Sequence, residues 1–294
     1  MIGVGQARGT FGELLQGVLP DGEHFLVTLP VTQGTTAFFT PTPESPAVTV
    51  EPGHKHKALT LARLALDVLG LPGGGHLLLT GNLPEGKGMA SSSADLVATA
   101  RAVADAAGRV LTAPEIEALL RGLEPTDGVM YDHIVAFHHR DVRLRNTLGC
   151  LPGLVIVGYD EGGQVDTVAY NRDLPVIGPA TRREYALLLD RLTTAVARGD
   201  LATVGGIATR SAELHAGRHG RDAFRPVRRA CRAAGGLGVV AAHSGTMLGV
   251  LLAADDPELA AKIDDIRGRC ASLGGRTSVH RSVTLTDAGV SGAS

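Results

Sequence analysis

Residues 84–95 read PEGKGMASSSAD, and this stretch decides the fold of the chain. It follows a short strand expected at 76–80 and leads into a helix with an apolar stripe. A glycine-rich loop that runs into a helix start offers free backbone N–H groups and the positive end of the helix dipole. Such a loop predicts a phosphate-binding site.

Three serine hydroxyls strengthen that prediction. Ser91, Ser92 and Ser93 can contact a phosphate or a hydrated Mg²⁺. The alternative is an ordinary serine-capped helix after a flexible turn. Three serines exceed what one cap needs, and two flanking glycines allow a ligand to approach closely, but the residues by themselves leave both interpretations open.

The same stretch nearly spells a P-loop, because Gly81 is followed after four residues by Gly86 and Lys87. The next residue is Gly88, where that motif requires the Ser or Thr that binds Mg²⁺. The preceding strand is also short and belongs to no clear series of βαβ units. We therefore reject the P-loop interpretation.

Upstream of the loop, the chain alternates strand and helix patterns. Residues 23–51 are β-rich segments separated by Gly and Pro, and 55–69 has helical periodicity. Downstream, Thr112-Ala-Pro-Glu115 forms a capping box with Pro in the first turn, which predicts a further helix. The N-terminal half is thus expected to be mixed α/β.

The second half has a different order of elements. Setting extra helices aside, it follows the β-α-β-β-α-β order of a ferredoxin-like fold. We place the domain boundary near 149–152, which gives domains 1–150 and 151–294. The expected strands are 153–159, 238–242, 247–254 and 277–286, and the expected helices are 181–199 (opened by a T-x-x-E cap), 201–215, 222–234 and 257–273.

Composition narrows the class of protein. Hydrophobic residues make up 44% of the 294 residues, which is ample for a core. Lys plus Arg number 28 against 30 Asp plus Glu, so the chain lacks the basic surface of a nucleic-acid binder. The apolar runs are far shorter than the ~20 residues of a membrane span, and no signal peptide is visible. Three unpaired-looking cysteines favour a reduced, cytoplasmic protein.

The run P-x3-G-[ML]-x-S-S-x-A resembles the second motif of the GHMP kinases, the superfamily of galacto-, homoserine and mevalonate kinases. ARGTFGELLQG (7–17) is similar to their N-terminal motif, and AAHSGTMLGVLL (241–252) is similar to their C-terminal motif. GELLQG, EPTD (124–127), LGCLP (148–152), ATRSA (208–212) and AHSGT (242–246) most resemble the L-threonine kinases of cobalamin side-chain synthesis. The resemblance spans nearly the whole chain.

The resemblance implies an α+β protein with two domains and ATP in a deep cleft between them. The N-terminal domain would be α/β and ribosomal-protein-S5-like, and the C-terminal domain ferredoxin-like, βαββαβ. ATP and Mg²⁺ would be the cofactors, with Ser92 near the metal. Lys87 would add charge, or would be a solvated loop lysine. The implied ATP- and phosphate-binding residues are Pro84, Gly86, Lys87, Gly88, Met89, Ala90, Ser91, Ser92 and Ser93.

Asp127 resembles the catalytic Asp of the family. A carboxylate there can orient an alcohol and accept its proton. The alternative is an acidic residue in the first turn of a further helix. Glu124 is the protein ligand for Mg²⁺ that the resemblance implies.

Many members of the family carry Lys or Arg in the first motif, whereas this chain has Thr10 there. Either Arg8 takes the place of that basic residue, or the phosphate accepts the proton.

Glu13 and Gln16 are candidates for binding the substrate's ammonium or hydroxyl group, and the alternative is a polar turn between glycines. The resemblance places His243, Ser244, Gly245 and Thr246 beside the substrate and phosphate loops. Their alternative is a tight hairpin with Gly at positive φ. No histidine pair has acids or cysteines at zinc-like spacing, so we expect no transition-metal site.

The resemblance implies an ATP-dependent kinase for a small-molecule hydroxy amino acid, with L-threonine as the expected acceptor. Other hydroxy amino acids, a specialised-metabolite alcohol, or a non-catalytic nucleotide or metabolite sensor on the same fold remain alternatives. We expect neither nucleic acid nor membrane as a partner. A homodimer is one option, and the sequence does not report the oligomeric state.

Overall fold

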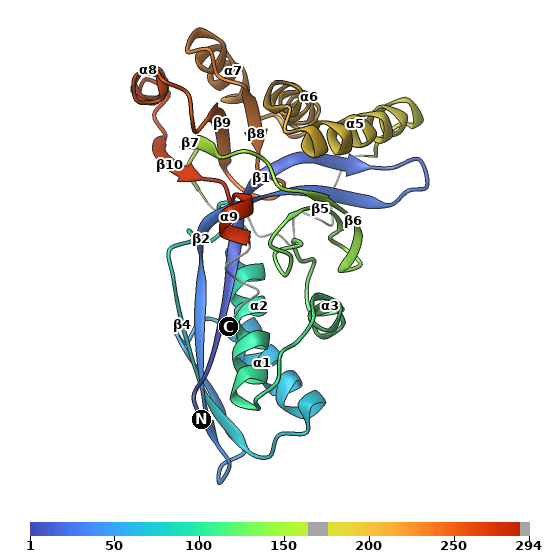
Figure 1. Ribbon diagram of the computed structural model, residues 1–294, viewed down its shortest axis with the longest axis vertical. Coiled ribbons are helices and arrows are strands. Elements are labelled where there is room, and N and C mark those ends of the chain that lie inside the picture. The colour runs from blue at the N-terminus through green and yellow to red at the C-terminus, as the bar shows by residue number, and fades with distance from the viewer. Residues whose placement is uncertain (164–175, 289–294) are drawn as a thin grey trace.

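A computed structural model describes residues 1–163 and 176–288 (Figure 1). The N-terminal half combines long strands with helices that pack beside them, in the lower part of Figure 1. Its strands are β1 (Gly3–Val18), β2 (His24–Thr42), β3 (Val48–Glu51), β4 (Gly74–Gly81), β5 (Ile134–His138) and β6 (Arg143–Gly149), and its helices are α1 (His56–Leu69), α2 (Ser91–Ala106) and α3 (Ala113–Leu120).

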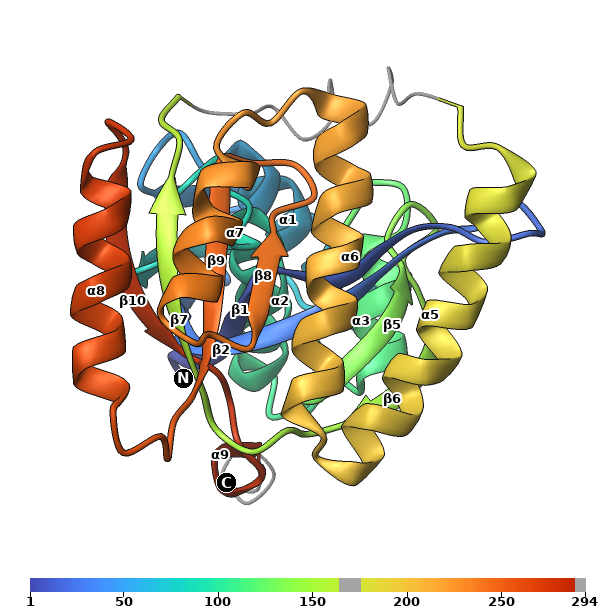
Figure 2. The same ribbon diagram turned by 90° about the horizontal axis from the view of Figure 1, so that it is seen from above.

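The C-terminal half carries helices over one side of its strands, as Figure 2 shows from above. Helix α6 packs on β8, and α7 packs on β8 and β9. The strands are β7 (Leu154–Asp160), β8 (Gly238–Ala241), β9 (Met247–Ala253) and β10 (Arg276–Arg281), and the helices are α5 (Pro179–Arg198), α6 (Leu201–His219), α7 (Phe224–Ala233), α8 (Leu259–Ala271) and α9 (Leu285–Ala288).

One sheet runs through both halves in the order β10-β7-β9-β8-β1-β2-β4-β3. All neighbouring pairs among the four C-terminal strands are antiparallel, and β7 lies between β10 and β9. That is the ferredoxin-like arrangement expected from the β-α-β-β-α-β order. The α+β fold class is confirmed.

Strand β1, which the sequence pattern missed, joins the two halves. Gly12 has φ +53° and forms a bulge, after which Glu13 pairs with Ala241 of β8. A left-handed φ favours glycine at such a bulge. The Thr10 hydroxyl donates to Gly12 O at 3.1 Å and accepts from Leu29 N–H at 2.9 Å, which stabilises the bulge. Thr10 is therefore a structural residue.

Of the two capping signals in the sequence, one is confirmed and one is wrong. The capping box of Thr112 and Glu115 is present at the start of α3. The T-x-x-E cap at 181–184 is wrong, because α5 begins at Pro179 after the N-cap Gly178. No helix follows Asp127 either, since the chain turns through 128–133 into β5. The hairpin of β5 and β6 was not predicted.

Three hydrophobic clusters fill the interior. One lies under α1, α2 and α3, and another lies between β7–β9 and the helices α7 and α8. The third contains residues from both sides of position 150, including Phe11, Leu14, Ile156 and Tyr185. The halves are thus packed together through a shared apolar core.

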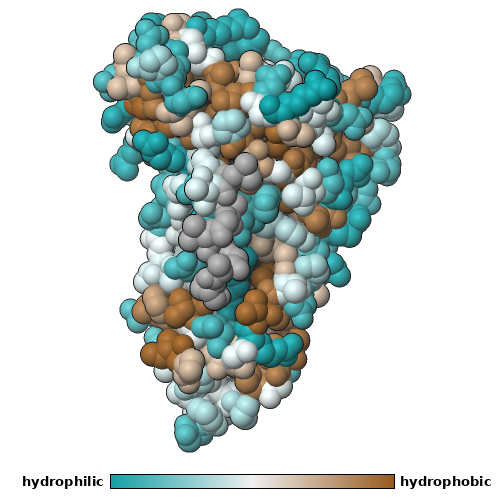
Figure 3. All heavy atoms as spheres, in the orientation of Figure 1, coloured by the Kyte–Doolittle hydropathy of each residue, from teal (hydrophilic) through white to brown (hydrophobic). Residues whose placement is uncertain are grey.

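The surface in Figure 3 shows hydrophilic side chains over much of the visible face, with hydrophobic ones in smaller groups between them. In the parts of the chain that the structure describes, no helix has both the length and the apolar character needed to cross a bilayer.

Candidate active site

A cavity of about 640 Å³, the central cavity, lies where the two halves meet. Its walls come from the start of α1, the loop 86–93 before and at the start of α2, the segment 124–127, and the turn between β8 and β9. The sequence-predicted residues that line it are Gly86, Gly88, Met89, Ala90, Ser91, Ser92, Ser93, Glu124, Asp127, His243 and Ser244.

The loop 86–93, called the glycine-serine loop below, is shaped by backbone conformation. Gly86 and Gly88 have φ of +68° and +83°, and Ala90 has φ +58° as the N-cap of α2. No side chain caps the N-terminus of α2. The serine-capped helix is therefore not what forms here. A helix start without a side-chain cap leaves its first N–H groups for a ligand.

The serines instead hold the two acids of the EPTD segment. The Ser92 hydroxyl donates to Glu124 Oε1 at 2.5 Å, and the backbone N–H of Asp127 donates to Ser93 Oγ at 3.2 Å. Residues 32 to 34 positions apart are thereby joined beside the start of α2. Glu124 and Asp127 both face the cavity.

Three carboxyl groups form a row at this wall: Glu124 and Asp127 line the cavity, and Glu13 lies outside its lining. Burial, and next the charge of Glu124, raise the pKa of Asp127 to about 7. Glu13 is 3% exposed. Its burial, and next the charge of Asp127, raise its pKa well above the usual range. A hydrogen bond from the backbone N–H of His243 acts in the other direction and lowers this pKa. Glu13 Oε2 is buried and has no hydrogen-bond partner within the described residues. Asp127 and Glu13 therefore favour a bound proton or a neighbouring cation.

The turn between β8 and β9 supports Gln16 and the glycine-serine loop. Gln16 Nε2 donates to Ala241 O at 3.1 Å, and its Oε1 lies 2.8 Å from His243 Nδ1. Gly245 is absent from the positive-φ residues, so the positive φ expected under the hairpin alternative is not found. Glycine is needed there for space, because a Cβ at Gly245 would collide with the backbone of Lys87 and Gly88.

Two lysines of the cavity wall were missed. The segment HKHK (54–57) had no recognisable motif, yet all four residues line the cavity. Lys55 Nζ lies 2.6 Å from Asp95 Oδ2, and Lys57 Nζ pairs with Glu124. A helical charge run is usually a solvated face, so only the fold reveals that these lysines meet the acids.

Histidine 139 was also missed as a wall residue. It lines the cavity, and its ring centroid lies 4.9 Å from that of His243. Its carbonyl oxygen accepts from Thr126 N–H at 2.9 Å, which ties the EPTD segment to β5. The ATRSA segment contributes Ser211, whose Oγ accepts from Gln16 N–H at 3.1 Å.

Several predicted residues do not line the central cavity. Arg8 lines a different pocket with Arg101 and Asp132, and donates to Asp287 O at 3.0 Å. It is therefore not brought beside Asp127. Lys87 points to Asp160, at 2.7 Å. Those outside the described lining are Arg8, Glu13, Gln16, Pro84, Lys87, Gly245 and Thr246.

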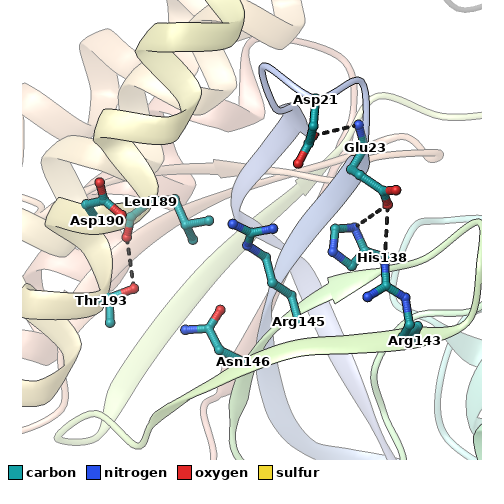
Figure 4. Close-up of a pocket in the computed structure, with 9 residues that line it drawn as sticks. All are labelled: Asp21, Glu23, His138, Arg143, Arg145, Asn146, Leu189, Asp190 and Thr193. Atoms are coloured by element: carbon teal, nitrogen blue, oxygen red, sulfur yellow. Dashed lines mark hydrogen bonds and ion pairs between the residues drawn. The ribbon is translucent and has the colours of Figure 1, made fainter.

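A second cavity of about 630 Å³, the outer cavity, is drawn in Figure 4. Glu23 there accepts from Arg143 Nη2 at 3.4 Å and lies 3.2 Å from His138 Nδ1. Arg145 and Asn146 face the same space from β6 (Figure 4). None of the sequence-predicted site residues lines it.

Over residues 1–163 and 176–288, no group of three His, Cys, Asp or Glu residues has metal-site geometry.

Comparison with known proteins finds similar sequences over most of the chain. The family profile of the GHMP kinases N terminal domain matches residues 56–138, which include α1, α2 and the glycine-serine loop. An L-threonine kinase of Citrobacter freundii is 27% identical over 263 residues, covering 85% of this chain and 86% of that protein. An L-threonine kinase of Salmonella typhimurium is 26% identical over 270 residues, covering 85% and 83%.

Solved structures share the fold. A homoserine kinase from Cytophaga hutchinsonii superposes with a TM-score of 0.75 at 16% identity, covering 96% of this chain and 95% of that one. The L. major mevalonate kinase gives 0.72 at 17% identity, covering 97% and 96%. The chain therefore shares its fold with small-molecule kinases. Residues 56–138 match the GHMP kinases N terminal domain, and together with the L-threonine kinase relatives this match indicates a phosphotransferase with an alcohol group as acceptor.

Proposed function

We propose that this protein transfers the γ-phosphoryl group of ATP to the hydroxyl of L-threonine, giving O-phospho-L-threonine and ADP. The observation that carries the proposal is the row of Glu124, Asp127 and Glu13 beside an uncapped helix start. The two L-threonine kinases that resemble the chain support the choice of acceptor. We propose 1–150 and 151–294 as the domains that form the cleft.

The glycine-serine loop would hold the polyphosphate. Its free helix start offers N–H donors, and Gly86 and Gly88 keep side chains out of the way. Ser92 and Ser93 are already oriented by their bonds to Glu124 and Asp127. Donors fixed before the reaction stabilise developing negative charge without a reorganisation cost at the transition state.

Asp127 would act on the acceptor. The threonine oxygen attacks the γ-phosphorus, the bond from that phosphorus to the β,γ-bridging oxygen breaks, and the hydroxyl proton passes to the Asp127 carboxylate. A pKa of about 7 suits a group that must accept a proton at neutral pH. Ser93 supports this role, because its bond to the Asp127 N–H fixes the backbone.

Glu124 and Ser92 would hold Mg²⁺. Mg²⁺ binds hard oxygen ligands, commonly one or two carboxylates together with substrate phosphates. The site fits: a carboxylate and a hydroxyl lie 2.5 Å apart at the helix start, and Lys57 already provides a cation there. When bound, Mg²⁺ supplies positive charge that offsets the charge of the phosphates.

Glu13 would bind the ammonium group of the amino acid. Its unpartnered Oε2 is buried, and when Glu13 is ionised a cationic or proton-donating group would satisfy that oxygen. The ammonium would also relieve the repulsion between Glu13 and Asp127, so the row of acids fits an amino acid better than a sugar. Gln16 would keep His243 in place beside it.

A coupled ADP-release assay tests the acceptor. We expect L-threonine to give the highest kcat/KM among L-threonine, L-serine, L-homoserine and galactose. ADP release with another alcohol and none with threonine would leave the kinase family intact and reject threonine. ATP binding without ADP release from any alcohol would favour the sensor alternative.

A matched pair of acceptors tests Glu13. (R)-3-Hydroxybutyrate keeps the hydroxyl and carboxylate of L-threonine but lacks its ammonium group. Wild type should prefer threonine by about tenfold or more, because a missing polar partner leaves a buried group unpaired. Glu13→Gln should lose most of that preference. An unchanged preference would remove Glu13 from the ammonium site.

A further inference from the structure

Lys87 lies in the glycine-serine loop, yet its side chain leaves the central cavity. Its Nζ is 2.7 Å from Asp160 Oδ2, and it donates to Gly163 O at 2.6 Å. Both side chains of the ion pair are largely buried, with 18% and 17% exposed. Asp160 ends β7 in the C-terminal half, so this pair joins the loop to the other half of the protein.

Asp160 also binds the turn between β8 and β9. Its Oδ1 accepts from the Thr246 hydroxyl at 2.5 Å and from Gly162 N–H at 3.0 Å. The next residue along, Glu161, donates its N–H to Thr246 O at 3.0 Å. The end of β7 and the turn are thus fixed to each other, and Lys87 adds the loop to them.

The backbone repeats the same connection. Met247 N–H donates to Lys87 O at 3.3 Å, and Gly245 packs directly on the backbone of Lys87 and Gly88. On the other side of the turn, Arg221 donates to Gly245 O at 3.0 Å and pairs with Glu161 at 2.6 Å. The turn is held from both sides, so it is a firm support for the loop.

We propose that Lys87 is a positioning residue: through Asp160 and Thr246 it holds the glycine-serine loop in the geometry that binds the phosphates, and it does not contact them itself. This inference rests on the proposed binding of ATP at that loop. Asp160 satisfies the Lys87 charge, so a direct phosphate contact would require the pair to break and leave a largely buried carboxylate without its cation.

A direct phosphate contact of Lys87 and an action through Asp160 predict different effects of substitutions at Lys87 and Asp160. If Lys87 acts through Asp160, then Lys87→Met, Asp160→Asn and the double variant remove one and the same interaction. Each single variant should raise the KM for ATP roughly three- to thirtyfold. The double variant should be no worse than the worse single one. The KM for the acceptor should stay within about twofold, because the acceptor side of the cavity is untouched.

The measurements are initial rates with ATP and L-threonine, calorimetric binding of ADP with Mg²⁺, and thermal unfolding. The control is the pair Lys262 and Asp256 on the C-terminal side, also at 2.7 Å with 20% and 19% exposed. Lys262→Met and Asp256→Asn should leave the KM for ATP unchanged. Thr246→Val, which removes the hydroxyl from Asp160, should weaken ATP binding as Asp160→Asn does, and serves where that variant fails to fold.

Two results would overturn the inference. One is a large loss of ATP affinity in Lys87→Met with Asp160→Asn at or above the wild-type affinity, which marks a direct phosphate contact. The other is a double variant whose effect is the product of the two single effects. Wild-type protein that binds no ATP or ADP would instead reject the proposed function, and the two failures are therefore distinguishable.

Discussion

The central and outer cavities have nearly the same volume, about 640 and 630 Å³, and both contain carboxylates, histidine and cations. They differ in burial. The Glu124 side chain that lines the central cavity is 4% exposed, whereas the Glu23 side chain of the outer cavity is 37% exposed and shares Arg143 and His138 (Figure 4). Water screens exposed charges, and burial magnifies their interactions. Burial, more than size or residue type, separates the site from an ordinary surface hollow.

The largest expected effect comes from exchanging one carboxylate in each cavity. Asp127→Asn should keep the fold and nucleotide binding but lower kcat by ~10²–10⁴-fold, because the amide is nearly isosteric and cannot accept a proton. Glu23→Gln should leave kcat unchanged. Steady-state kinetics with calorimetric ADP binding measures both. A loss below about tenfold in Asp127→Asn would favour proton transfer to the phosphate itself.

A pH profile sharpens the same contrast. Asp127 must be deprotonated to act as a base, and its pKa is about 7. The value of kcat/KM should therefore fall about tenfold per pH unit well below 7 and level off above it. The profile should keep its shape in Glu23→Gln. If the kcat/KM of the wild type is constant from pH 5.5 to 8.5, Asp127 does not titrate in the step that limits kcat/KM.

Much of the fold could be predicted because its signals are local. Thr112 and Glu115 are three residues apart, and the strand and helix patterns of the C-terminal half each lie within one segment. The order of those elements then restricts the topology. By contrast, β1 contains Gly9, Gly12 and Gly17, and its glycine-rich motif hid a strand that its pairing with β2 and β8 stabilises.

Sequence motifs predicted the residues that line the cavity, but they did not predict the directions in which the lysine side chains point. The serine run and Asp127 were found, and both line the cavity. Lys87 was expected at the phosphates, but its direction depends on Asp160, which is 73 positions away in the sequence. Lys57 was missed for the same reason, because its partner Glu124 comes from another segment. Side-chain direction is set by tertiary partners that spacing alone does not reveal.

The smallest expected effect concerns stability. The pKa of Glu13 is raised chiefly by burial and further by Asp127, so the folded protein binds this proton more tightly than the unfolded chain, where a Glu has a pKa near 4.3. The stability that this carboxyl contributes is present at low pH and is lost as the pH rises through its folded pKa. At pH 8 the buried charge is therefore destabilising.

Glu13→Gln removes that charge and keeps an oxygen acceptor for the His243 N–H. We expect its Tm to exceed that of the wild type by a few degrees at pH 8, at about 2–4 °C per kcal/mol for a chain of this size. The difference should narrow at pH 5, and Glu23→Gln should show no such dependence on pH. Thermal unfolding without ligand at both pH values measures this. A Tm lowered equally at pH 5 and pH 8 would mean that Glu13 stabilises the fold by packing and hydrogen bonding. In that case no destabilising buried charge is present for the acceptor's ammonium group to neutralise.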